Sequence, residues 1–341
     1  MKQIFCTLFD SNYIDKGLVL YDSMCRHISD FTLYVFAFDD KCYEILREEN
    51  LKNMVVVSLK EFETSELIKV KSERTRAEYC WTCSSWTIKY VLENFGEAIC
   101  TYIDADMMFF SSPELIFQDM MNKQCSTIIV PHRFKSAVEE KKAHDEVGSY
   151  CVQFNTFLKD ENGMAALNWW AEKCLEWCFY AVPGTTEWYG DQKYLNAFPE
   201  KFDGVYICNH FGLGMAPWNN CLLDWAEGRE NEHGEYVPHI RVLATGEELP
   251  VILYHFENVS FLTKHIFHVS SCMSSKQLHK EIYDTYVSMI LKKREYIENK
   301  YQFSLSKERR VVTKNPLIRL YHKYILPIRR VKKLSDLYWV K

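Results

Sequence analysis

The hydrophobic pattern of the first 60 residues alternates between two periods. Short runs rich in β-branched and aromatic residues are followed by segments whose apolar residues recur at helical spacing. The runs predict strands at 2–8, 31–38 and 54–59, and the spaced segments predict helices at 17–27 and 42–51. This order of strand, helix, strand, helix and strand is typical of a parallel sheet with crossover helices. The sequence therefore predicts an α/β fold.

The rest of the chain continues the alternation less regularly. The pattern predicts helices at 78–95 and 163–180 and a short one within 184–199. It predicts strands at 126–131 and 151–158 and a last strand at 251–256. An apolar run covers 98–110, and a charged loop is expected at 134–148. From residue 276 onward the pattern is helical and ends in a basic segment. We expect one α/β domain over residues 1–270 and a helical basic extension over residues 271–341.

Composition excludes several classes of protein. Of the 341 residues, 48% are hydrophobic and 26% are charged, which is a globular balance and not that of a disordered or collagen-like chain. No stretch reaches the roughly 18 apolar residues of a membrane-spanning helix, and the first residues lack the pattern of a secretory signal. We expect a cytoplasmic protein whose 13 cysteines are reduced thiols.

Charge is distributed unevenly along the chain. Residues 291–341 hold 15 Lys/Arg and 4 Asp/Glu, a net charge of +11, while the rest of the chain carries −16. Such a segment has three possible roles: it is a solvated tail, it binds an anionic membrane surface, or it binds nucleic acid. Basic residues alternate with apolar and aromatic ones over 317–339, which favours peripheral attachment of residues 300–341 to the cytoplasmic face of the inner membrane. No nucleic-acid-binding signature is present, so nucleic acid is not an expected partner.

Two carboxylates at positions i and i+2 are the sharpest chemical feature of the sequence. Asp104 and Asp106 flank Ala105 at the end of an apolar run, and a turn at 111–113 follows. In an extended backbone they face the same way and can share a hard divalent cation, Mn²⁺ or Mg²⁺, which bridges to phosphates. An Asp-x-Asp pair is also common in solvated loops, but the core-like residues on both sides of this one make an unpaired carboxylate costly.

The segment resembles the Asp-x-Asp motif of GT-A-fold nucleotide-sugar glycosyltransferases, especially the glycogenin-like family and bacterial enzymes of polysaccharide assembly. Other segments resemble the same family in the same order over residues 1–265; they are TLFDSNY at 7–13, GLVLYDS at 17–23, Thr87-Ile88-Lys89, Phe154-Asn155-Thr156, Gly190-Asp191-Gln192 and Tyr254-His255-Phe256. Thr156 and Phe157 stand where the family has Ser-Gly, which places the chain at a distance from glycogenin itself.

The resemblance implies a role for each matched residue. It implies a metal held by Asp104, Asp106 and His255, with Asp191 and Gln192 at the reacting sugar. It also implies donor binding by a further set of residues, which are Leu8, Phe9, Tyr13, Lys89, Ala105 and Asn155. Arg74 or Arg76 would add positive charge near the phosphates. Ordinary structural roles stay open, since Asp191 would also cap a short helix and His255 would also suit a buried strand.

The implied activity is metal-dependent transfer of a hexose or N-acetylhexosamine from a UDP-sugar to a surface glycan or lipid-linked glycan, with retention at the anomeric centre. A sugar-nucleotide hydrolase or pyrophosphorylase is one alternative, and a non-catalytic protein that binds membranes or nucleic acid is another. Cys80 and Cys83 lack the partners of a zinc site, which favours structural thiols. Trp218, in a loop rich in glycine and proline, is a candidate for stacking on an acceptor sugar.

Overall fold

The computed structural model describes residues 2–181, 186–231, 234–263, 266–269, 276–305 and 337–339. Its main sheet has seven strands in the order β3-β2-β1-β4-β7-β6-β8. Every strand of this sheet is parallel to the others except β7, which is antiparallel to β4 and β6. The strands are β1 Gln3–Phe9, β2 Phe31–Ala37, β3 Met54–Ser58, β4 Ile99–Ile103, β6 Thr127–Pro131, β7 Tyr150–Leu158 and β8 Val205–Ile207. The predicted α/β fold with a mostly parallel sheet is confirmed.

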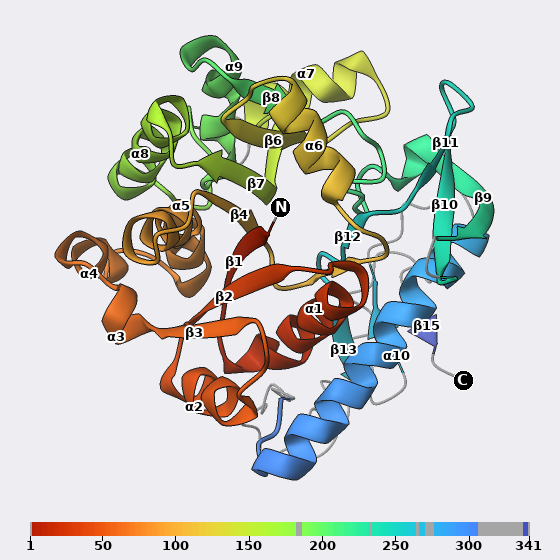
Figure 1. Ribbon diagram of the computed structural model, residues 1–341, viewed down its shortest axis with the longest axis horizontal. Helices are drawn as coiled ribbons and strands as arrows, with labels where there is room; N and C mark the ends of the chain where they lie inside the picture. The colour runs from red at the N-terminus through yellow and green to blue at the C-terminus, as the bar shows by residue number, and fades with distance from the viewer. Residues whose placement is uncertain are drawn as a thin grey trace, which may run out of the picture.

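Helices connect and cover these strands (Figure 1). Every residue of β1 and β2 is buried, so both faces of the sheet are covered there. The longest helix of the first half, α5, begins with a capping box in which Thr75 and Glu78 bind each other's backbone N–H groups. The helices are α1 Ile14–His27, α2 Asp40–Glu49, α3 Leu59–Phe62, α4 Ser65–Lys71, α5 Arg76–Asn94, α6 Glu114–Asn122, α7 Ala137–Glu146, α8 Glu161–Glu176, α9 Phe198–Lys201 and α10 Lys276–Tyr301.

Smaller sheets extend the structure beyond the main sheet. The two-stranded ribbon of β5 and β12 follows directly on the carboxyl end of β4, while β9, β10 and β11 form one three-stranded sheet and β13, β14 and β15 another. Their bounds are β5 Met107–Phe109, β9 Leu223–Glu230, β10 Tyr236–Val242, β11 Glu248–Pro250, β12 Leu253–His255, β13 Ser260–Thr263, β14 Ile266–His268 and β15 Leu337–Trp339. Three 3₁₀ segments complete the described elements: η1 Ser11–Tyr13, η2 Gln192–Ala197 and η3 Asn220–Leu222.

Helix α10 lies beside α1 and crosses the near side of the molecule in Figure 1. Three ion pairs join it to the first part of the chain: Lys293 with Asp22 at 2.7 Å, Arg294 with Asp15 at 2.8 Å and Lys300 with Glu49 at 2.8 Å. The start of the predicted extension is therefore packed on the α/β part. The division at residue 270 stays a prediction.

Two expectations for secondary structure are wrong. Residues 134–148 were expected to be a loop but contain α7, which begins at Ser136 with a side-chain cap to the Glu139 N–H and buries only Ala143. With a single buried residue, this helix has no hydrophobic period by which the sequence could show it. The strand at residue 253 is not the last one either, because β13, β14 and β15 follow it.

None of the helices among the described residues is both long and apolar enough to cross a bilayer. Most of the basic segment singled out in the sequence, from residue 306 to residue 336, lies outside the described residues. Its attachment to a membrane therefore stays a prediction.

Candidate active site

The two aspartates of the Asp-x-Asp segment lie where β4 ends. Asp104 directly follows β4, and Ala105 and Asp106 form a turn that leads into β5. The ribbon of β5 and β12 pairs Met107 with His255, and the Phe256 N–H donates a hydrogen bond of 2.9 Å to the Asp106 carbonyl. A segment almost 150 positions later in the chain is thus placed beside the aspartates by backbone hydrogen bonds.

The three side chains face one another. His255 Nε2 lies 3.2 Å from Asp106 Oδ1 and 3.8 Å from Asp104 Oδ2. Lys16 Nζ lies 3.5 Å from Asp106 Oδ2, and the Tyr102 hydroxyl donates to Asp104 Oδ1 at 2.9 Å. The extended backbone expected for the two aspartates is wrong, since the chain turns between them, yet both carboxylates are directed to the same imidazole.

Burial and neighbouring charges shift the pKa values of the two carboxyl groups in opposite directions. Burial raises the pKa of Asp104 to about 6, and the charge of Asp106 adds to that rise while His255 opposes it. Burial also acts on Asp106, but the charge of Lys16 and the contact with His255 outweigh it and lower its pKa to about 2. Burial lowers the pKa of His255, and the two aspartates more than reverse this, so the net shift is upward. Near neutral pH the cluster therefore holds more than one carboxylate close to an imidazole.

Asp191 is a third carboxyl in the same region, and it is more deeply buried than Asp104 and Asp106. Its side chain accepts a hydrogen bond of 2.6 Å from the Ser84 hydroxyl on α5, and 5% of the residue is exposed. Burial raises its pKa to about 7, and the charge of Asp104 adds to the effect, while the hydrogen bond from Ser84 opposes it. Asp191 stands at the start of η2, but its side chain makes no cap hydrogen bond there. The alternative role of Asp191 as a helix cap is therefore wrong. The next residue, Gln192, donates to the Val147 carbonyl at 2.8 Å.

The face of the sheet under this cluster carries buried amides. Asn155 on β7 pairs with Tyr102 on β4, so their side chains lie on the same face. Asn155 is fully buried, and neither polar atom of its amide has a hydrogen-bond partner. A buried amide without partners is costly, and it indicates a group that a polar ligand would satisfy.

Three of the residues predicted to bind the donor, which the resemblance places at its nucleotide base, lie at the end of β1 and just after it. Leu8 and Phe9 are buried at 7% and 4% exposure, whereas Tyr13 is 42% exposed. Lys16 Nζ lies 4.2 Å from the centre of the Tyr13 ring. Their contacts with a nucleotide base stay a prediction.

The cation found at the aspartates is one that the sequence analysis did not single out. Lys16 contacts Asp106, whereas Lys89 lies 3.9 Å from Glu93 and over the Trp86 ring. Arg74 donates to the Leu175 carbonyl on α8 and to the Thr82 hydroxyl. The roles of Lys89 and Arg74 toward a donor stay predictions. In the sequence, Lys16 directly precedes the first predicted crossover helix, at 17–27, and nothing else there marks it.

Trp218 packs at the edge of the cluster. Its ring lies edge-on to the imidazole of His255, with centres 5.6 Å apart and planes at 86°, and edge-on to His132. Cys80 and Cys83 are free thiols, and burial raises the pKa of Cys80 to about 12, which disfavours the reactive thiolate. This agrees with the structural role expected for the two cysteines.

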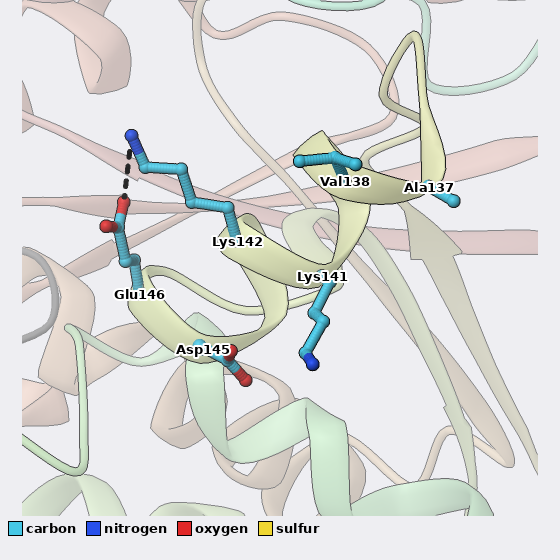
Figure 2. Close-up of a pocket in the computed structure, with 6 residues that line it drawn as sticks. All are labelled: Ala137, Val138, Lys141, Lys142, Asp145 and Glu146. Carbon is cyan, nitrogen blue, oxygen red and sulfur yellow. Dashed lines mark ion pairs between the residues drawn. The ribbon is translucent and has the colours of Figure 1, made fainter.

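Within the described ranges, no group of three or more His, Cys, Asp and Glu side chains stands ready to hold a metal ion. A hollow of about 460 Å³ lies along α7, and Figure 2 shows the residues that line it, which are Ala137, Val138, Lys141, Lys142, Asp145 and Glu146. All of its lining residues belong to that one helix. This surface hollow contains none of the candidate site residues.

The fold and the site define an α/β protein with a cluster of carboxylates, an imidazole and an ammonium group at the carboxyl edge of its sheet. No protein-family model matches the chain. The chain is 30% identical over 268 residues to the uncharacterized protein YfnD of Bacillus subtilis (strain 168), covering 78% of this chain and 80% of YfnD. It therefore belongs to the same family as YfnD. The uncharacterized protein YfnF of the same organism is 28% identical over 287 residues, covering 82% and 86% of the two chains.

Solved structures with similarity to this chain include glycosyltransferases. The galactosyltransferase LgtC, in complex with donor and acceptor sugar analogues, matches 84% of this chain and 95% of its own, with 12% identity and a TM-score of 0.48. Mouse xyloside xylosyltransferase 1 matches 63% of this chain and 88% of its own, with 10% identity and a TM-score of 0.43.

Proposed function

We propose that this protein is a metal-dependent glycosyltransferase that moves a hexose or N-acetylhexosamine from a UDP-sugar to a surface glycan or lipid-linked glycan, with retention at the anomeric centre. One observation carries the proposal: Asp104 and Asp106 face His255 at the carboxyl edge of the sheet, 3.8 and 3.2 Å from its Nε2 atom. Ligands of open α/β sheets bind at this edge.

The chemistry of Asp104, Asp106 and His255 suits a divalent cation, although the three side chains do not stand ready as a metal site in this structure. Two carboxylates and one imidazole nitrogen suit Mn²⁺, and Mg²⁺ is the alternative for the carboxylates. The unpartnered amide of Asn155 on the same face of the sheet is a further polar group for a ligand at this position. When bound, the cation would offset the negative charge that develops on a departing diphosphate.

Lys16, Asp191 and Tyr13 would bind other parts of the donor and the acceptor. Lys16 supplies a second positive charge next to Asp106, where it would attract the phosphates of the donor. Asp191, with a pKa of about 7, is near its midpoint at neutral pH, so it could hold an acceptor hydroxyl or take a proton from it. Tyr13 is exposed enough to stack on a base.

The first prediction concerns the aspartates. Asp104→Asn and Asp106→Asn should each weaken Mn²⁺ binding roughly 100-fold or more, because each removes a charged ligand. Isothermal titration with Mn²⁺ and UDP measures this, and Asp40→Asn, at an exposed carboxyl on α2, is the matched control. Undiminished binding in both site variants would contradict the proposal.

A panel of nucleotide-sugars with Mn²⁺ identifies the reaction. Release of nucleoside diphosphate that depends on an added glycan acceptor supports transfer, and NMR of the product reads the anomeric configuration. Release at the same rate without acceptor would indicate a hydrolase, and release of pyrophosphate would indicate a pyrophosphorylase.

A further inference from the structure

A buried amide links the imidazole of the candidate site to the loop behind it. Gln153 on β7 is fully buried, and its Oε1 lies 3.1 Å from His255 Nδ1. Its Nε2 donates to the Gly214 carbonyl at 3.3 Å. A backbone carbonyl only accepts hydrogen bonds, so the NH₂ end of the amide must face Gly214 and the oxygen end must face His255.

This orientation places a proton on Nδ1 of His255. Because Gln153 Oε1 only accepts, Nδ1 must donate to it, so Nε2 is the nitrogen that faces the aspartates and that a cation would take. Nε2 is the atom that lies 3.2 Å from Asp106 and 3.8 Å from Asp104. The edge of Trp218 against the imidazole restricts its rotation as well.

We propose that Gln153 is the positioning residue that holds His255 in the tautomer and orientation needed to bind a divalent cation between the aspartates. The inference rests on the proposed function and adds a residue that neither the motif nor the resemblance indicated. Metal-binding histidines commonly donate their second ring N–H to a fixed acceptor, and loss of that acceptor costs about 10–100-fold in metal affinity.

Gly214 belongs to the same arrangement. Its φ of +72° is a left-handed conformation that favours glycine, and a Cβ there would lie 2.7 Å from Gln153 Nε2 and 2.5 Å from Val130 Cγ1. A side chain at this position would therefore push the amide away from its place. Asn219 also donates to the Gly214 carbonyl, at 2.9 Å, so that carbonyl keeps a partner when Gln153 is replaced.

Two substitutions separate the two hydrogen bonds of Gln153. Gln153→Met keeps the approximate shape but removes the acceptor, which leaves the His255 Nδ1–H without a partner. Gln153→Glu keeps an acceptor for His255 and loses the donor to Gly214. Thr101→Val is the matched control, because it removes a buried side-chain hydrogen bond of 2.8 Å to Thr156 on β7, the strand that also carries Gln153.

The first measurement is the affinity for Mn²⁺ alone, from the free-ion signal in electron paramagnetic resonance. We expect binding about 10–100-fold weaker in Gln153→Met and within a few-fold of the wild type in Gln153→Glu and Thr101→Val. Equal weakening in Gln153→Met and Gln153→Glu would assign the effect to the Gly214 loop and overturn the proposal. Wild-type affinity in Gln153→Met would overturn it too.

The second measurement detects the hydrogen bond itself. In ¹H–¹⁵N spectra of the protein loaded with diamagnetic Mg²⁺, the Nδ1–H proton of His255 should be shifted downfield and protected from exchange by its hydrogen bond to Gln153, and Gln153→Met should lose both effects. The His255→Gln spectrum assigns the signal. An unchanged Nδ1–H signal in Gln153→Met would contradict the positioning role even if that variant were less stable.

The two proposals fail in different ways. If Mn²⁺ binds equally well to the wild type and to Asp104→Asn, the proposed metal site is wrong. If binding depends on Asp104 but not on Gln153, the site stands and the inference about Gln153 is wrong.

Discussion

The three aspartates of the site differ because their immediate neighbours differ. Asp106 has Lys16 and His255 beside it and a pKa of about 2, whereas Asp104 has a tyrosine hydroxyl, the imidazole and the charge of Asp106, and a pKa of about 6. Asp191 has a serine hydroxyl and burial, and a pKa of about 7. The same side chain is thus an anion in one place and close to half-protonated in another, which is what separate roles for a ligand and a proton acceptor need.

Asp191 should make stability depend on pH. Its pKa is about 7 in the fold and 3.8 as the ordinary value, so between these pH values the unfolded chain loses a proton that the folded chain keeps. Stability contributed by the protonated form is complete below about pH 4 and is lost as pH rises to 7. Asp191→Asn should therefore equal the wild type near pH 4 and exceed it at pH 8 by a few kcal/mol, at most about 4.

Urea unfolding of metal-free protein across this pH range measures the difference. Asp203→Asn, at an exposed carboxyl, is the control and should show no trend. A difference between Asp191→Asn and the wild type that stays constant with pH would contradict the prediction.

At the scale of elements, the β5–β12 ribbon and helix α10 help to position the side chains of the site. The β5–β12 ribbon places His255 opposite Met107, next to the turn that carries the aspartates. Helix α10 packs on α1, and its Arg294 forms an ion pair with Asp15, which is only 1% exposed. Asp15 directly precedes Lys16, so the C-terminal helix supports the start of the helix that supplies a cation to the site.

Removing the cation of this pair should destabilise the fold. Arg294→Met leaves the buried carboxylate of Asp15 without its guanidinium partner, which should cost about 3 kcal/mol in the free energy of unfolding. Lys292→Met, at an exposed position on the same helix, should change it by less than about 0.5 kcal/mol. Denaturant unfolding of both variants is the measurement, and equal stabilities would show that the pair contributes little.

At the scale of the whole molecule, opposite charges lie in different parts of the chain. Residues 291–341 carry +11 and the remainder −16. An acidic body and a basic end favour one orientation near an anionic surface, with the basic end toward it. A protein that acts on lipid-linked acceptors would gain from such an orientation.

Vesicle sedimentation of the full chain tests this. Replacing Arg329, Arg330, Lys332 and Lys333 with glutamine should weaken binding to phosphatidylglycerol vesicles at least about 10-fold, since each basic residue near the surface contributes roughly 1 kcal/mol. The control replaces four exposed lysines of the body, Lys52, Lys60, Lys69 and Lys141, and changes net charge by the same amount. Equal losses in the two variants would indicate a response to net charge alone.

The α/β class, most of the strands and the Asp-x-Asp segment could be predicted from the sequence, because hydrophobic periodicity and composition are local properties of the chain. The sequence also indicated His255, but only through resemblance. The tertiary structure alone brought Lys16, Gln153 and Ser84 to the site, since contacts of α1, β7 and α5 and the pairing of β5 with β12 join residues up to almost 150 positions apart. The tertiary structure also sets the pKa of each aspartate, because burial and the distance to another charge depend on the fold and not on the residues adjacent in sequence.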